Sequence, residues 1–136
     1  ADPMQFGKDR ILLAEEMPIH EDYRRRLIAA AETDPQWYPN LYDVGWPDSP
    51  HRALRNSTAN AWEAAGRPPD DQRPGQGDVI AHFASGEAIV RYEPAPPMAG
   101  TTGDIEALSM WAGQGVALAR ERQSAAEIVA ELTSHL

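Results

Sequence analysis

The residue pattern most suggestive of a binding site is the triplet Gly113–Gln114–Gly115, which lies within "MWAGQGVAL" at residues 110–118. Apolar spacing over residues 104–121 predicts a helix, and a glycine in a helix interior costs about 1 kcal/mol relative to alanine. Two such glycines therefore indicate a helix break, close packing of the backbone, or a ligand held near the backbone. Gln114 adds a side chain that can both donate and accept hydrogen bonds. The triplet lacks the spacing of phosphate-binding glycine loops.

The titratable residues form neither a catalytic nor a metal-binding pattern. His20, His51, His82 and His135 have no H-x-H or i, i+4 spacing that would favour a metal site. His82 alternates with apolar residues of a predicted strand, so we expect it on the solvent face. His51 stands beside two arginines, and a loop or capping role is favoured over catalysis. Without cysteines, and with carboxylates that are scattered or adjacent along the chain, we expect no catalytic residues.

Four aromatic residues lie close together in a proline-rich stretch, at Trp37, Tyr38, Tyr42 and Trp46. Two interpretations remain open for them. They form either a small satellite core or an aromatic surface that faces a ligand or another domain.

The charge of the chain limits its partners. Its net charge is −9 over 136 residues, and an acidic surface repels nucleic acids and anionic membranes, so neither is an expected partner. The basic cluster Arg24–Arg26 adjoins acidic residues and predicts a solvated helix face.

No apolar stretch reaches the roughly 18 residues of a membrane span and no signal peptide is visible, so we expect a cytoplasmic protein. We expect Ala1–Pro3 to be residues added for expression ahead of Met4; a processed natural N-terminus is the alternative.

Helix signals occur in three further segments. Residues 21–32 carry apolar residues on one stripe, with acidic residues at the N-terminal end. Residues 59–65 follow the capping residues Asn56, Ser57 and Thr58 and end at Gly66. Residues 125–132 follow a capping box formed by Ser124 and Glu127.

Strand signals are strongest at residues 78–83 and 87–92, which "ASG" separates as in a hairpin. A short strand is expected at residues 40–44, and residues 11–14 are compatible with a strand or a helical turn. The 12 prolines and 10 glycines predict short elements and many loops. Together these signals predict a small single α+β domain over residues 1–136, with helices packed on a short antiparallel hairpin or sheet.

Three blocks of the sequence resemble the C-terminal part of nitronate monooxygenases, also called 2-nitropropane dioxygenases. The pattern W-P-D-x-P-H-R-x-L-R-N of that family corresponds to Trp46–Asn56, and G-D-x-E-A-x-x-x-x-A-G-Q-G-V corresponds to Gly103–Val116. The terminal A-A-E-I-V helix corresponds to Ala125–Val129. The resemblance covers most of the chain from Tyr42 onward, and residues 6–23 are similar more loosely to the end of the family's barrel.

In this family a flavin-binding (β/α) barrel carries a smaller α/β domain. The resemblance implies that the FMN site and the catalytic histidine belong to an upstream barrel that this chain has no room for. It also implies that Ala112–Gly115 lies near the barrel and the cofactor. The cofactor-contacting residues it indicates are Gly113, Gln114 and Gly115, with no FMN bound by this chain alone.

The resemblance leads to a first hypothesis, an interaction or complementing module for a separate flavin barrel, not catalytic by itself. The alternative is an FMN-dependent nitronate monooxygenase-like oxidoreductase that forms by self-assembly, and a third possibility is a relic without activity. A surface that packs on a barrel should be apolar, so we expect a homo-oligomer or a barrel-bearing partner. The expected contact residues are Met110, Trp111, Val116 and the Trp37–Trp46 loop.

Overall fold

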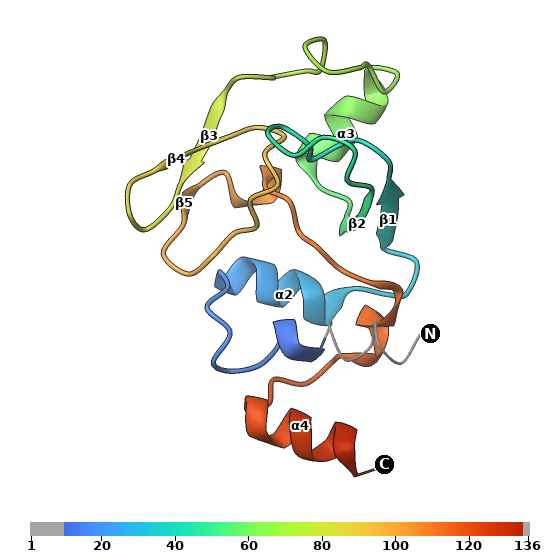
Figure 1. Ribbon diagram of the computed structural model, residues 1–136, viewed down its shortest axis with the longest axis vertical. Helices are drawn as coiled ribbons and strands as arrows, with labels where there is room; N and C mark the ends of the chain where they lie inside the picture. The colour runs from blue at the N-terminus through green and yellow to red at the C-terminus, as the bar shows by residue number, and fades with distance from the viewer. Residues whose placement is uncertain (1–9, 135–136) are drawn as a thin grey trace.

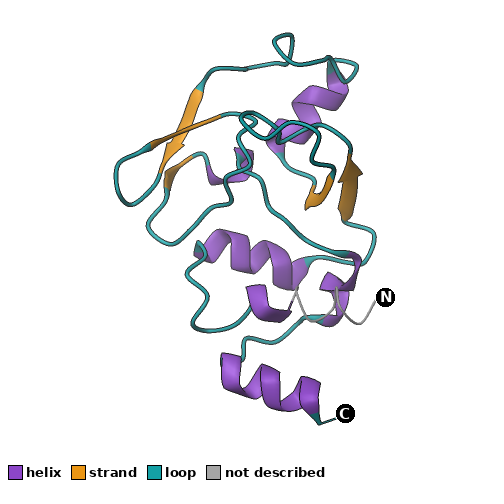
Figure 2. Cartoon of the chain, viewed as in Figure 1, coloured by secondary structure: helices purple, strands orange, loops and turns teal. Residues whose placement is uncertain are grey.

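The structure, a computed structural model, describes residues 10–134. Figure 1 shows the two sheets and helix α3 in its upper half, helix α2 across the middle and helix α4 at the lower end. Loops make up much of the chain between these short elements (Figure 2). The expectation for Ala1–Pro3 falls outside the described residues.

Helix α2, Glu21–Ala29, confirms the first predicted helix. The Nδ1 atom of His20 caps it by accepting a hydrogen bond from the Asp22 amide at 3.0 Å, and acidic side chains in the first turn suit the helix dipole. Tyr23 and Leu27 are buried as the stripe predicts, whereas Ala31 lies beyond the helix and is exposed.

The first sheet pairs strands β1, Pro35–Tyr38, and β2, His51–Leu54, in antiparallel register. The strand predicted at residues 40–44 is wrong, because this segment joins β1 to β2 as turns and coil. Leu41 and Tyr42 are nevertheless buried. Their apolar character reflects side-chain packing rather than a place in a hydrogen-bonded ladder.

Helix α3, Ser57–Ala64, follows as predicted, with Asn56 as its N-cap. The predicted hairpin is also confirmed as β3, Val79–His82, and β4, Ala88–Val90. Strand β5, Thr102–Gly103, adds a third member in the order β4-β3-β5. His82 is exposed, as its alternation in the strand predicts.

The helix predicted over residues 104–121 is wrong. The chain forms two short 3-10 helices instead, η1 at Ile105–Ala107 and η2 at Gln114–Leu118. Between them it runs extended beside β2, with Ala53 and Trp111 paired as an isolated bridge. The Leu54 amide donates to the Met110 carbonyl at 2.8 Å. The apolar residues that suggested a helical face are buried all the same, because the segment crosses the core.

Helix α4, Ala125–Thr133, begins at the predicted capping box of Ser124 and Glu127. It buries Ile128, whereas Val129 is 58% exposed. Residues 10–12 form a helical turn and Ala14 makes a single bridge with Gln123. Of the two interpretations of residues 11–14, the helical turn is confirmed, and the single bridge at Ala14 does not make a strand.

Two clusters of buried side chains form the core of this α+β fold. One lies among α2, the β3–β5 sheet and residues 105–119, and includes Leu27, Ile89 and Met110. The other is aromatic and joins β1 and β2 to α3 through the packed side chains of Tyr38, Tyr42, Trp62 and Tyr92. Within residues 10–134 no helix has the length and apolar character needed to cross a membrane.

Candidate functional site

The triplet Gly113–Gln114–Gly115 lies where an extended segment turns into η2. Gly113 is the N-cap of η2 and has extended backbone angles, φ −93° and ψ 174°. Both glycines are buried, whereas Gln114 is exposed. Of the explanations for the two glycines, the structure supports a break in the helix, so the expected cost of glycine inside a long helix does not arise.

The segment that leads to the triplet is held by side chains at the start of α3. Ser57 Oγ donates to the Glu106 carbonyl at 3.1 Å, and Thr58 Oγ1 donates to the Ala107 carbonyl at 2.7 Å. Asn56 Nδ2 donates to the Leu108 carbonyl at 2.6 Å. These bonds satisfy carbonyls that a helix would otherwise pair, so they favour the extended course of the chain. The sequence marked Asn56, Ser57 and Thr58 only as helix caps.

Further contacts hold the segment immediately before the triplet. The Tyr23 hydroxyl donates to the Trp111 carbonyl at 2.5 Å. The Ala112 amide donates to the Arg52 carbonyl at 3.4 Å, next to the Ala53–Trp111 bridge. Gln114 therefore projects from a backbone that α2, β2 and α3 all hold in place. Its amide can form hydrogen bonds, but the triplet has no group that could act as an acid, base or nucleophile.

His51 belongs to the same region because its ring packs against Trp111. The ring centroids are 4.7 Å apart with an interplanar angle of 78°. His51 Nδ1 lies 2.9 Å from the Ser49 carbonyl, and Nε2 accepts from the Tyr42 amide at 3.4 Å. Both contacts are satisfied by the neutral tautomer with hydrogen on Nδ1. Burial lowers the pKa of His51 from its ordinary value, which favours this neutral form.

The aromatic residues at positions 37–46 divide between the two interpretations left open by the sequence. Tyr38 and Tyr42 are buried in the aromatic core, where Tyr42 donates to Asn56 Oδ1 at 2.8 Å. Trp37 and Trp46 are 53% and 56% exposed. The Arg52 guanidinium lies 5.6 Å from the centre of the Trp37 ring.

Two of the expected contact residues cannot serve as a docking surface in this structure. Met110 and Val116 have no exposed area and belong to the chain's own core. Their apolar character suggested a surface that packs on a barrel, but the same side chains are buried within this chain. Trp111 is partly buried against Tyr42 and His51.

Large apolar side chains are exposed on three elements near the two ends of the described chain: the helical turn at residues 10–12, η2 and α4, the last at the lower end of Figure 1. Ile11 is 52% exposed in the helical turn at residues 10–12, Leu118 is 61% exposed at the end of η2, and Val129 lies on α4. Arg10 donates to Gln123 at 2.5 Å and pairs with Glu131 at 2.5 Å, which joins the turn to α4. We call these three side chains, Ile11, Leu118 and Val129, the apolar end.

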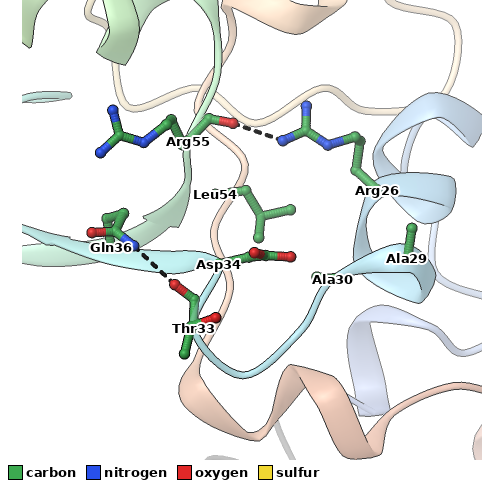
Figure 3. Close-up of a pocket in the computed structure, with 8 residues that line it drawn as sticks. All are labelled: Arg26, Ala29, Ala30, Thr33, Asp34, Gln36, Leu54 and Arg55. Atoms are coloured by element: carbon green, nitrogen blue, oxygen red, sulfur yellow. Dashed lines mark hydrogen bonds between the residues drawn. The ribbon is translucent and has the colours of Figure 1, made fainter.

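Two clefts lie on the surface, one beside α2 and one beside η2. A cleft of about 290 Å³ separates α2 from the first sheet (Figure 3). Its two guanidinium groups are already engaged: Arg26 donates to the Arg55 carbonyl at 2.7 Å and pairs with Glu106, and Arg55 pairs with Glu63. A second cleft, of about 390 Å³, borders η2 and includes Arg10, Leu118 and Glu131 in its lining.

The triplet by itself does not make up a flavin site. Its groups comprise one side-chain amide and the peptide groups of two glycines, at the start of a 3-10 helix of five residues. An FMN phosphate is held by several N–H donors or cations, and the triplet does not supply such a set. Among the described residues there is also no cluster of histidine and carboxylate side chains that could hold a metal ion.

Comparison with known proteins adds no assignment. The chain matches no protein-family model, and no curated protein is significantly similar to it.

Proposed function

We propose that this chain is a non-catalytic interaction module that complements a separately folded flavin barrel of the nitronate monooxygenase kind. The proposal starts from the resemblance of residues 46–56, 103–116 and 125–129 to the C-terminal part of that family. The observation that carries it is the exposure of Gln114 on a segment whose backbone is otherwise held in the core. A module that completes another protein's site needs a rigidly placed group of this kind.

The apolar end supports the same proposal. The three structural elements at this end each expose one large apolar side chain, and one of these, Leu118, closes the 3-10 helix that Gln114 opens. Burying a leucine or valine side chain contributes about 1.5–3 kcal/mol. Contact with a barrel would therefore gain affinity at the apolar end and bring Gln114 to the barrel surface.

The chemistry of the triplet limits the role of this chain to binding and positioning. A glutamine amide donates and accepts hydrogen bonds but does not ionise near neutral pH, so it is not a general acid or base. In the proposed complex Gln114 hydrogen-bonds to the flavin or to the barrel beside it. The barrel supplies the FMN site and the reacting groups.

The direct test is binding to a nitronate monooxygenase barrel that is loaded with FMN and lacks its C-terminal part. We expect saturable binding by interferometry, and Leu118→Asp should weaken it about tenfold or more, since about 1.4 kcal/mol corresponds to each factor of ten. Val79→Asp is a matched control, because Val79 is 55% exposed but lies on β3 in the second sheet. The absence of binding up to about 100 μM, or equal weakening by both variants, would overturn the proposal.

The self-assembling oxidoreductase makes a different prediction that a flavin titration separates. In that case the chain alone quenches FMN fluorescence saturably, the quenching disappears in a Gly113→Val/Gly115→Val double variant, and light scattering shows an oligomer. Under the proposal made here, FMN fluorescence stays unchanged when this chain is added without a barrel.

A further inference from the structure

We propose that His51 is a pH-sensitive latch, whose protonation loosens Trp111 and with it the support of the Gly113–Gly115 segment. The latch is a property of this chain alone. Only its consequence, a pH-dependent presentation of Gln114 to a partner, rests on the proposed function.

The hydrogen bonds of His51 require a neutral ring. Nδ1–H donates to the Ser49 carbonyl at 2.9 Å, and the unprotonated Nε2 accepts from the Tyr42 amide at 3.4 Å. Protonation places a hydrogen on Nε2, so two donors then face each other and the Tyr42 amide loses its acceptor. The contact at 3.4 Å is long enough for a small displacement of the ring to break it.

The His51 ring lies where its displacement would affect the segment that leads to the triplet. His51 lies among three aromatic rings, with centroid distances of 6.0 Å to Tyr38, 5.6 Å to Tyr42 and 4.7 Å to Trp111. Trp111 is the nearest of the three and lies two residues before Gly113. If the charged His51 ring moves toward water, the Trp111 ring therefore loses one of the rings that it packs against.

Within the described part of the chain, no charged group near His51 is free to balance the positive charge that the ring gains on protonation. Asp43 is the carboxylate that favours the charged ring, but it is bound to the Arg73 guanidinium at 2.7 Å. Burial raises the pKa of both Tyr38 and Tyr42, so the two phenols stay neutral throughout the acidic range. Arg52, the neighbour on β2, stacks its guanidinium over Trp37, and the 108–113 segment contributes the uncharged Trp111.

Tyr23 and β2 oppose the movement, which confines the latch to a local change. The Tyr23 hydroxyl holds the Trp111 carbonyl, and the strand-like contacts of residues 110–112 hold the backbone. We therefore expect the Trp111 ring and the peptide groups that follow it to shift or become mobile, without unfolding of the domain.

The test is an NMR titration of the full ¹⁵N-labelled chain from about pH 7.5 to pH 5. We expect the His51 ring to titrate below the ordinary pKa of a histidine side chain, because burial disfavours its charged form. The Trp111 indole N–H and the amides of Gly113 and Gly115 should shift with the midpoint of His51. His51→Gln should remove these shifts, while His82→Gln should leave them unchanged.

The latch is overturned if the Trp111 and glycine signals stay fixed while His51 titrates, or if their pH-dependent shifts persist in His51→Gln. It is also overturned if His51 remains neutral down to pH 5. Should His51→Gln fail to fold, the wild-type chain and His82→Gln still decide the question. A failed barrel-binding experiment leaves these signals unaffected, so the two proposals fail separately.

Discussion

Replacing Asn56 by alanine tests whether the start of α3 determines the course of residues 104–113. Asn56 is 3% exposed, and its side chain makes three hydrogen bonds. Its Oδ1 accepts from the Ala59 amide at 3.0 Å and from the Tyr42 hydroxyl at 2.8 Å, and its Nδ2 donates to the Leu108 carbonyl at 2.6 Å. Asn56→Ala removes all three bonds at once.

The expected loss follows from the burial of the groups left behind. Removing an N-cap costs about 1 kcal/mol, and each buried polar group left without a partner costs about 1–3 kcal/mol. Tyr42 and Leu108 are both fully buried, at 1% and 2% exposure. We therefore expect Asn56→Ala to lower the free energy of unfolding by about 3–7 kcal/mol, a large part of the roughly 5–15 kcal/mol of an ordinary domain.

Urea denaturation followed by tryptophan fluorescence measures this loss. Ser57→Ala is the matched control, because the exposed Ser57 hydroxyl makes one bond to the Glu106 carbonyl, at 3.1 Å, and should cost less than about 1 kcal/mol. Asn56→Asp retains the cap but turns an acceptor toward the Leu108 carbonyl, so it should also destabilise at pH 7. A loss below about 1 kcal/mol for Asn56→Ala, or one equal to that of Ser57→Ala, would refute the reasoning.

Three further predictions concern other parts of the fold. Arg73→Met should lower the free energy of unfolding by about 3 kcal/mol in thermal or urea denaturation, because it leaves the half-buried Asp43 carboxylate without its cation; a loss below about 1 kcal/mol would contradict this. The pKa of His51 is lowered on folding, so the unfolded chain binds the proton more readily and stability should fall as the pH drops below about 6.5; His51→Gln should flatten this dependence in urea midpoints, and an unchanged slope would count against it. Ser124→Ala should cost α4 about 1 kcal/mol and speed amide exchange within that helix, whereas faster exchange spread over the whole chain would disagree with a local cap.

Much of the fold could be predicted because its signals are local. The capping box of Ser124 and Glu127 needs side chains only three residues apart, and it forms as the sequence indicates. The hairpin of β3 and β4 likewise joins neighbouring segments through a short turn. The exposure of His82 then follows from the alternation of a strand.

The third strand, β5, depends on a close approach that no local pattern shows. A Cβ at Gly103 would lie 2.6 Å from the Ile80 carbonyl oxygen, and φ at this residue is 114°. Glycine is therefore required where β5 meets β3. The sequence showed the glycine but not the strand that it would meet.

The sequence by itself indicated the apolar stripe of the 105–119 segment that is buried, but not the conformation of that segment. Ile105, Leu108 and Val116 fit a helical face, and all three are buried although no long helix forms. The backbone of this segment bonds to side chains of α2 and α3 and to strand β2, which come from earlier parts of the chain. Only the tertiary structure brings those partners to it, and once they satisfy its carbonyls, the extended course with an exposed Gln114 replaces the helix.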